Sequence, residues 1–345
     1  MTNIILILLI FCAVLFFYIH IYSHLKTGDD LEIYEIENPS KDKFEEICDI
    51  RQPVIFNFNN KNLNNIFNVN NIIEKYGVFD VKVKDTLKTN TDNELNQFAS
   101  EETHIPIKFK DALNVLDNQN TIIENNSDFL EETGLIKYYK YNDIFIKPYV
   151  TLLNEYDYII GSDKYQTQLK YDISYRTYYY VSEGKIKIKL TPPKNIKYLN
   201  VIKDYENFEF YSHMDPWNIQ EEYQNDFDKI KFLEVDIEQG QIIYIPAYWW
   251  YTIEFSENTS VCKFKYYSYM NYIAILPHLI IRFLQTQNVK RYIVDKIIDD
   301  SVNVNKINEI NKSTEINETT EINESTEINE TTKINKNNKV KNKKI

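Results

Sequence analysis

The 345-residue chain has few glycines, few cysteines and a deficit of basic residues, and each shortage excludes a class of function. Six glycines give no glycine-rich loop of the kind that cradles nucleotide phosphates. The three cysteines, Cys12, Cys48 and Cys262, form no CxxC pattern, so neither a disulfide framework nor a cysteine metal site is indicated. Lysine and arginine number 39 against 51 acidic residues, which argues against nucleic acid as a partner because phosphate neutralisation needs clustered basic residues.

The chain is instead rich in aromatic residues, with 28 tyrosines and 19 phenylalanines, and aromatic residues favour β-strands. Apolar and polar residues alternate over 156–190 and again over 232–267, which predicts strands. Residues 111–116 and 127–130 are typical of short helices, and apolar residues recur at helical spacing over 272–298. Together these patterns predict a β-rich α+β fold, with two packed sheets at its centre and helices around them.

The N-terminal segment Ile4–Ser23 contains no charged residue. As a helix it is long enough to cross a hydrocarbon core of about 30 Å, so residues 1–25 are predicted to be a single-pass transmembrane anchor. A cleaved signal peptide is the alternative. The start Met1-Thr2-Asn3 lacks a basic residue and no small-residue cleavage site follows Ser23, which favours the uncleaved anchor. Its orientation is weakly encoded, because Lys26 is the charge that flanks it closely.

The C-terminal segment, residues 306–345, is a low-complexity tail that repeats a hexad from Ile310 onward. One isoleucine in six residues builds neither a helical stripe nor a strand face, so disorder is predicted. The hexad places Asn-x-Ser/Thr sequons at Asn311, Asn317, Asn323 and Asn329, which are candidate glycosylation sites. Chance enrichment in Asn and Thr, or expansion of a DNA repeat, explains them equally well. The composition and the hexads resemble proteins of large AT-rich DNA viruses.

A series of motifs follows in fixed order along the middle of the chain. They are Gln52-Pro53-Val54-Ile55, Thr167-Gln168-Leu169-Lys170-Tyr171-Asp172, Gly184-Lys185-Ile186-Lys187, Leu190-Thr191-Pro192-Pro193 and, after Glu238-Gln239-Gly240, Ile245-Pro246-Ala247-Tyr248-Trp249-Trp250-Tyr251. The series resembles the JmjC/cupin-like hydroxylase family over about residues 31–285. The resemblance implies a double-stranded β-helix, or jelly roll, with surrounding helices. A terminal helix is predicted over 286–305, and the resemblance implies a possible homodimer through the C-terminal helices.

The resemblance places the family's iron ligands, two histidines and an aspartate, at Lys170, Asp172 and Tyr251. A lysine ammonium repels a metal ion, and a tyrosine must lose a proton before it binds one well. Asp172 alone is a natural ligand. We therefore expect a degenerate metal site, no metal or other cofactor, and a non-catalytic protein with a binding or structural role. The alternative is an active hydroxylase that uses Fe(II) and 2-oxoglutarate with an atypical ligand set.

The three residues at the degenerate site should lie within a few ångströms of one another if the resemblance holds. A buried ammonium needs a partner, so we expect Lys170 to pair with Asp172 or with the Tyr251 hydroxyl. The spacing His213-Met214-Asp215 permits an alternative metal centre, but Asp215-Pro216 is also typical of a turn.

The resemblance also implies a cosubstrate pocket. Its candidate residues are Thr167, Lys185, Lys187, Arg176 and Trp249. The alternative for the two lysines is a solvated strand face, since Lys185, Lys187 and Lys189 alternate with isoleucines. The alternative for Trp249 is a place in the core between two sheets.

Overall fold

The structure is a computed structural model that describes residues 2–85, 104–118 and 120–288. The hexad tail with its four sequons lies outside the described residues, and so does most of the terminal helix expected over 286–305.

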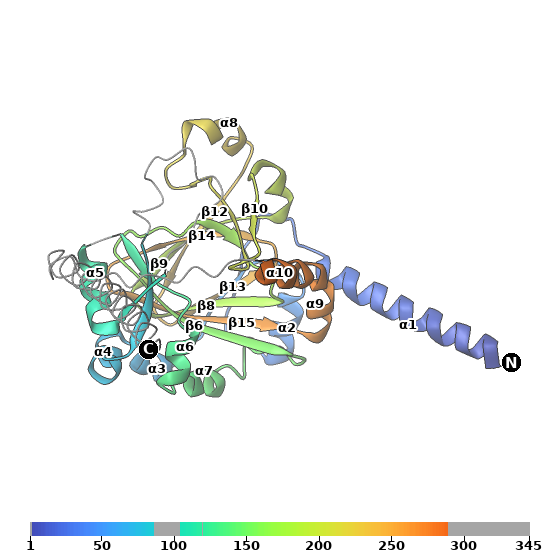
Figure 1. The fold of residues 1–345 in the computed structure, drawn as a ribbon, viewed down its shortest axis with the longest axis horizontal. Helices are drawn as coiled ribbons and strands as arrows, with labels where there is room; N and C mark the ends of the chain where they lie inside the picture. The colour runs from blue at the N-terminus through green and yellow to red at the C-terminus, as the bar shows by residue number, and fades with distance from the viewer. Residues whose placement is uncertain (1, 86–103, 119, 289–345) are drawn as a thin grey trace, which may run out of the picture. The chain divides into compact units, whose positions relative to one another are not determined.

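Two β-sheets form the centre of the described part of the chain (Figure 1). The first has the strand order β1 (Tyr34–Ile36), β2 (Val54–Asn57), β13 (Gln241–Pro246), β8 (Arg176–Glu183), β15 (Thr259–Tyr267), β6 (Leu153–Gly161), β5 (Thr121–Ile123), β3 (Asp80–Asp85) and β4 (His104–Lys108). The second has the order β10 (Ile202–Asp204), β11 (Glu209–Ser212), β7 (Leu169–Tyr171), β14 (Trp250–Phe255), β9 (Lys185–Thr191) and β12 (Leu233–Glu238). The strands predicted over 156–190 and 232–267 are thus confirmed.

The chain crosses repeatedly from one sheet to the other between β6 and β15. Strands β6, β8, β13 and β15 belong to the first sheet, and the intervening β7, β9, β12 and β14 belong to the second. Neighbouring strands of this group pair antiparallel. This arrangement fits a jelly roll, in which the inner faces of both sheets share one core.

Alternation along each strand decides which side chains enter the space between the sheets. On β9 the residues Ile186, Ile188 and Leu190 are fully buried, whereas the lysines between them are partly exposed. The buried residues of β9 belong to a core cluster with residues of β13 and β14, including Trp249 at the entry to β14. Burial of these apolar side chains holds the two sheets face to face.

Helices cover the other face of the first sheet. They are α2 (Lys41–Cys48), α3 (Lys61–Ile66), α4 (Val69–Tyr76), α5 (Phe109–Asn118), α6 (Ser127–Glu132) and α7 (Ile136–Asn142). The starts of α3 and α4 follow from local chemistry, because the side chains of Asn60 and Asn68 accept hydrogen bonds from the first free N–H groups. The helices predicted over 111–116 and 127–130 are confirmed as parts of α5 and α6.

The N-terminal helix α1 (Thr2–Leu25) is exposed along its length, and its segment Asn3–Leu25 is long and apolar enough to cross a membrane. A signal sequence would meet the same description. The end of α1 contacts the domain, since His24 Nε2 lies 3.1 Å from Ser268 Oγ. Two further helices follow β15, namely α9 (Tyr269–Ala274) and α10 (Leu276–Asn288), and a short α8 (Gln224–Phe227) precedes β12.

The predicted helical segment over 272–298 begins earlier than expected and is broken into α9 and α10. Pro277 lies in the first turn of α10, where its missing N–H costs no intrahelical hydrogen bond. The helix break is therefore placed just before this proline.

Arg176 joins the first sheet to α2 and provides a test of the fold. Its guanidinium is almost fully buried and lies 2.7 Å from Glu45 and 3.2 Å from Asp49. We expect Arg176→Met to lower the free energy of unfolding by about 3 kcal/mol, because it leaves the largely buried carboxylate of Glu45 without this partner. Denaturant unfolding measures the change. As a control, Lys43→Met breaks the exposed Lys43–Glu46 pair and should change stability by less than about 0.5 kcal/mol; equal effects of the two substitutions would contradict the assignment.

Candidate functional site

Asp172 and Tyr251 meet between the two sheets. Strands β7 and β14 are antiparallel neighbours, and their register places Tyr251 directly opposite Lys170. The fully buried Tyr251 donates a hydrogen bond from its hydroxyl to Asp172 Oδ2 at 2.7 Å, and its oxygen lies 2.7 Å from the hydroxyl of Tyr179 on β8. The backbone fixes Asp172 as well, since Tyr248 N donates to Asp172 O at 2.8 Å. The structure thus brings together residues that are 79 positions apart in the chain.

The expected pairing of Lys170 with Asp172 or the Tyr251 hydroxyl is wrong. The ammonium nearest to Asp172 is that of Lys265, whose Nζ lies 2.6 Å from Oδ1, and Lys263 Nζ lies 3.9 Å from Oδ2. Both lysines project from β15, two residues apart and therefore on the same face of the strand. They supply the positive charge that we expected from Lys170.

Lys170 instead pairs with Glu124, which follows β5. The Nζ of Lys170 lies 3.5 Å from Glu124 Oε2, and Lys84 Nζ lies 3.7 Å from the other oxygen. Glu124 is 6% exposed, so its charge depends on these two cations. Burial alone would raise the pKa of Glu124, but the charges of Lys170, Lys84 and Lys263 outweigh it and lower the pKa to about 2.

The same electrostatic argument holds at Asp172. Burial would raise the pKa of its carboxyl, but Lys263 and Lys265 lower it well below the usual range. Conversely, Asp172 raises the pKa of Lys265 against the effect of burial. The pKa of Tyr251 is raised well above 10, first by burial and then by the charge of Asp172. The network is therefore one of stable ammonium and carboxylate ions around a protonated phenol.

This arrangement does not fit an iron ion. Both oxygens of Asp172 are taken, one by the Tyr251 hydroxyl and one by Lys265. Lys170 is held as an ammonium, which has no electron pair to donate. Tyr251 is held as a neutral phenol, which is a weak metal ligand, and its hydroxyl is already hydrogen-bonded to Asp172 and Tyr179. Within the described residues, no group of three or more His, Cys, Asp or Glu side chains is placed to hold a metal. Where the resemblance would require two histidines beside Asp172, the structure has three lysines and a tyrosine.

The residues expected to form a cosubstrate pocket lie in four different surroundings. Lys185 and Lys187 point to the outer face of β9, where Lys185 pairs with Asp236 at 3.2 Å, so the alternative of a solvated strand face is correct. Arg176 faces α2, on the helix-covered side of the first sheet. Their placement in a pocket was wrong because alternation along a strand gives two faces without saying which is inner.

The other two candidates have structural roles. Thr167 uses its hydroxyl oxygen to accept a hydrogen bond from Ile253 N at 2.9 Å. Trp249 is fully buried in the core between the sheets, and its Nε1 donates to Arg51 O at 3.1 Å. The core alternative for Trp249 is therefore confirmed.

The alternative metal centre on His213 and Asp215 is also explained by local structure. Asp215 Oδ1 accepts a hydrogen bond from Trp217 N at 2.9 Å, which is the turn expected of an Asp-Pro sequence. His213 packs its ring edge-on to Tyr211, and its backbone oxygen accepts from Gln220.

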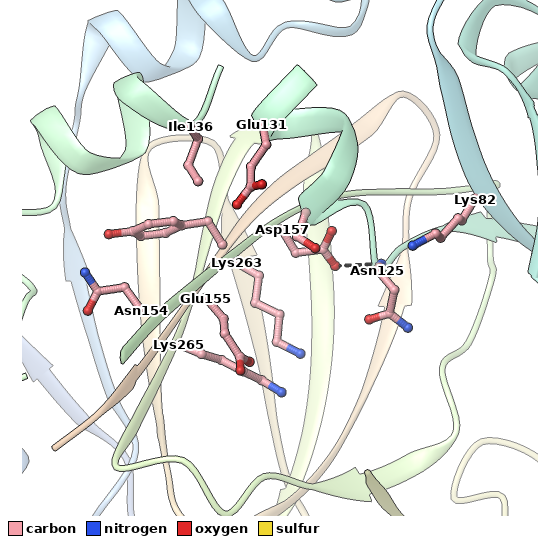
Figure 2. Close-up of a pocket in the computed structure, with 11 residues that line it drawn as sticks. Lys82, Asn125, Glu131, Ile136, Asn154, Glu155, Asp157, Lys263 and Lys265 are labelled. Atoms are coloured by element: carbon pink, nitrogen blue, oxygen red, sulfur yellow. Dashed lines mark hydrogen bonds between the residues drawn. The ribbon is translucent and has the colours of Figure 1, made fainter. Parts of the chain in front are cut away.

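A polar cavity of about 450 Å³ opens beside the network (Figure 2). Lys263 and Lys265 belong to the ion network around Asp172 and also line the cavity. The remaining wall is formed by Lys82, Asn125, Ser127, Glu131, Ile136, Asn154, Glu155, Tyr156 and Asp157. Figure 2 shows the side chains of Lys263, Lys265 and Glu155 lying close together, with Asp157 accepting from the backbone of Asn125. Burial raises the pKa of Asp157. The cavity presents charges of both signs.

The sequence alone did not reveal Glu124, Tyr179, Lys263 and Lys265. The signal for the two lysines was present, because Lys263-Phe264-Lys265-Tyr266 alternates on a strand. However, lysines that alternate on a strand usually face solvent, and the strand order is needed to show that these two turn inward.

Comparison with known families gives one match. The model of the cupin-like domain matches residues 40–272 of the chain. No curated protein sequence matches the chain.

The Glu124 cluster predicts how stability changes with pH. A carboxyl whose pKa is lowered by folding stabilises the protein above its unfolded pKa, and this contribution is lost as the pH falls through the folded pKa. We expect the free energy of unfolding to fall from about pH 4.5 to about pH 2. In Glu124→Gln this decline should be shallower, and stability at pH 7 should be lower by about 2 kcal/mol because Lys170 loses a buried partner.

Urea unfolding at a series of pH values measures both effects. Glu131→Gln is the control, since Glu131 is an exposed residue of the cavity wall, and it should change stability at pH 7 by less than about 0.5 kcal/mol. A Glu124→Gln profile parallel to that of the unmodified protein at every pH would contradict the account.

Proposed function

Because the chain belongs to the cupin-like domain family, we propose that it is a membrane-anchored cupin-like protein in which an ion network has replaced the metal site. We propose further that it acts without catalysis, in a binding or structural role. The observation that carries the proposal is the occupation of both Asp172 oxygens, by the Tyr251 hydroxyl at 2.7 Å and by Lys265 Nζ at 2.6 Å.

The strand order supports a double-stranded β-helix as the finer description of the fold. From β6 to β15 the chain passes repeatedly between two sheets, with β6, β8, β13 and β15 in one and β7, β9, β10, β11, β12 and β14 in the other. In such a fold the second and seventh strands are neighbours, as β7 and β14 are here. They bring the former ligand positions together at one end of the space between the sheets.

Charge balance supports the loss of metal chemistry. In a metal site of this type, one carboxylate and two neutral imidazoles each bind the dication directly. Here Lys263 and Lys265 are the positively charged partners of Asp172, and the charge of Lys170 is balanced by Glu124. A further dication would be repelled by at least three ammonium groups within the same cluster.

The cavity supports a binding role. Its volume of about 450 Å³ lies within the size range of small-molecule sites, and its wall carries both lysine and carboxylate side chains. A small polar ligand with charges of both signs suits such a wall. Anchoring is supported by α1, which is apolar over Asn3–Leu25 and exposed along its length.

Iron titration tests the proposal. We expect the unmodified protein, under anaerobic conditions and with 2-oxoglutarate present, to bind no stoichiometric Fe(II). The triple variant Lys170→His, Tyr251→His, Lys265→Met should gain measurable affinity, because it restores two imidazoles and frees Asp172 Oδ1. Iron retained after desalting, measured by elemental analysis, reports binding.

A matched control carries the same kinds of substitution elsewhere. Lys75→His with Tyr141→His changes an exposed lysine and an exposed tyrosine on two separate helices, and it should bind no iron. One equivalent of Fe(II) on the unmodified protein would contradict the proposal and favour the active hydroxylase with an atypical ligand set. A folded triple variant that stays iron-free would contradict the assignment of the former ligand positions.

A further inference from the structure

Helix α10 has an apolar face directed away from the domain. Leu276, Ile280 and Leu284 follow one another at four-residue spacing, and Phe283 and Ile281 flank them. These five side chains are between 43% and 64% exposed. A surface helix normally directs its apolar residues inward and its polar residues to water. The exposed face of α10 is therefore more apolar than is usual for a surface that faces water.

The ionisable residues of α10 point the opposite way, toward the domain. His278 Nδ1 lies 3.0 Å from the hydroxyl of Tyr205, and the guanidinium of Arg282 lies 4.7 Å from the ring centre of Phe208. Both are thus used in packing on the domain side. Leu279 packs on the domain as well, so α10 has apolar side chains on its inner face and on its outer face, and the outer ones have no partner among the described residues.

Helix α10 is connected through α9 to the end of α1. His24, in the last turn of α1, contacts Ser268, which is the N-cap of α9, and its ring lies 5.3 Å from that of Tyr175. Helix α10 follows α9 with Ile275 as the junction residue. Figure 1 shows α9 and α10 beside the base of α1.

A second group of exposed apolar residues lies next to the start of α9. Leu152 N donates to Tyr267 O at 2.7 Å, so the segment before β6 lies next to the residues that lead into α9. The exposed side chains of this segment and of the start of α9 are Tyr149, Val150, Leu152, Leu153 and Tyr269. Tyrosines and aliphatic side chains of this kind are typical of the boundary between lipid headgroups and acyl chains.

We propose that this surface, formed by the outer face of α10 with Tyr269 and residues 149–153, inserts into the interface of the bilayer that α1 crosses. The proposal rests on the proposed anchoring by α1. A helix that leaves a membrane at Leu25 and contacts α9 at His24 holds the domain within a few ångströms of the headgroups. The apolar face of α10 then meets lipid instead of water.

Two other occupants fit less well. The hexad tail from Ile310 onward has one isoleucine in six residues and cannot form a continuous apolar stripe along α10. A second copy of the protein could also bury the outer face of α10. A dimer contact limited to α10 would, however, leave the exposed apolar side chains of residues 149–153 and Tyr269 uncovered.

Depth-dependent fluorescence quenching tests the proposal on the full-length protein. The chain is reconstituted in phosphatidylcholine and phosphatidylserine vesicles with Cys12→Ser, because Cys48 and Cys262 are buried and leave a single introduced cysteine to be labelled. One sample carries Ile280→Cys and the other Val78→Cys, each with an environment-sensitive dye. Val78 is a 75%-exposed apolar residue next to α4, which lies on the side of the domain away from α1 in Figure 1.

Nitroxide lipids should quench the dye at Ile280 by about half, since an interfacial helix lies about 5–10 Å deep at the boundary of headgroups and acyl chains. The dye at Val78 should stay unquenched. Equal, low quenching at both positions in vesicles that co-float with the protein would overturn the membrane surface and leave the anchor intact.

Two other outcomes also decide the matter. A dye at Ile280 that is shielded from water but unquenched, with Ile280–Ile280 cross-links between chains, would overturn the proposal in favour of a dimer. Failure of the unlabelled protein to co-float with vesicles would overturn the anchor and this proposal together.

Discussion

The carboxylate of Asp172 is the charge around which the interior of this protein is organised. It lies between two sheets whose facing side chains are mostly aliphatic, where an unpaired charge would be strongly unfavourable. Tyr251 and Lys265 each bind one of its oxygens, and Tyr179 continues the chain of hydrogen bonds to β8. Four strands of the two sheets, β7, β8, β14 and β15, are thereby joined at one point.

We propose that the ammonium groups of the network take the place of a metal dication. In a metal-binding relative a dication would balance the aspartate, and neutral histidines would complete the site. In this chain the balancing charge is built into β15 as Lys263 and Lys265, and the extra ammonium of Lys170 is balanced by Glu124. A carboxylate can therefore stay largely buried at Asp172 without a metal ion. The cavity beside the network shares Lys263 and Lys265, so any ligand that enters it would contact the same charges.

Much of the fold could be predicted from the sequence, because the signals involved are local. The alternation over 232–267 predicts strands without any knowledge of the neighbouring strands. The apolar run Ile4–Ser23 likewise predicts a long apolar helix. The contact between Asp172 and Tyr251 could also be anticipated, since the order of motifs in a known fold carries information on strand pairing. Which charged residues form the ion pairs of the network could not be predicted from the sequence.

The partners depend on which face of each strand turns inward, and this is a property of the assembled sheets. Lys187 and Lys265 look alike in the sequence, each a lysine two residues from another on an alternating strand. Lys187 faces outward on β9, and Lys265 faces Asp172 from β15. Glu124 lies in a loop after β5 with no periodicity to mark it, and β5 itself is a strand of three residues that no pattern predicted. A shift of one residue in register reverses such assignments.

The central claim is that Lys265 and Asp172 form a strong, largely buried pair at the position where we propose that a metal site was lost. A double-mutant cycle with Lys265→Met, Asp172→Asn and the combined variant measures their interaction free energy directly from unfolding experiments. The account predicts a coupling of about 2 kcal/mol, so that the combined variant is destabilised by about 2 kcal/mol less than the sum of the two single variants. A coupling near zero, with stability unchanged in Lys265→Met, would show that Asp172 is balanced by something else and would contradict the account.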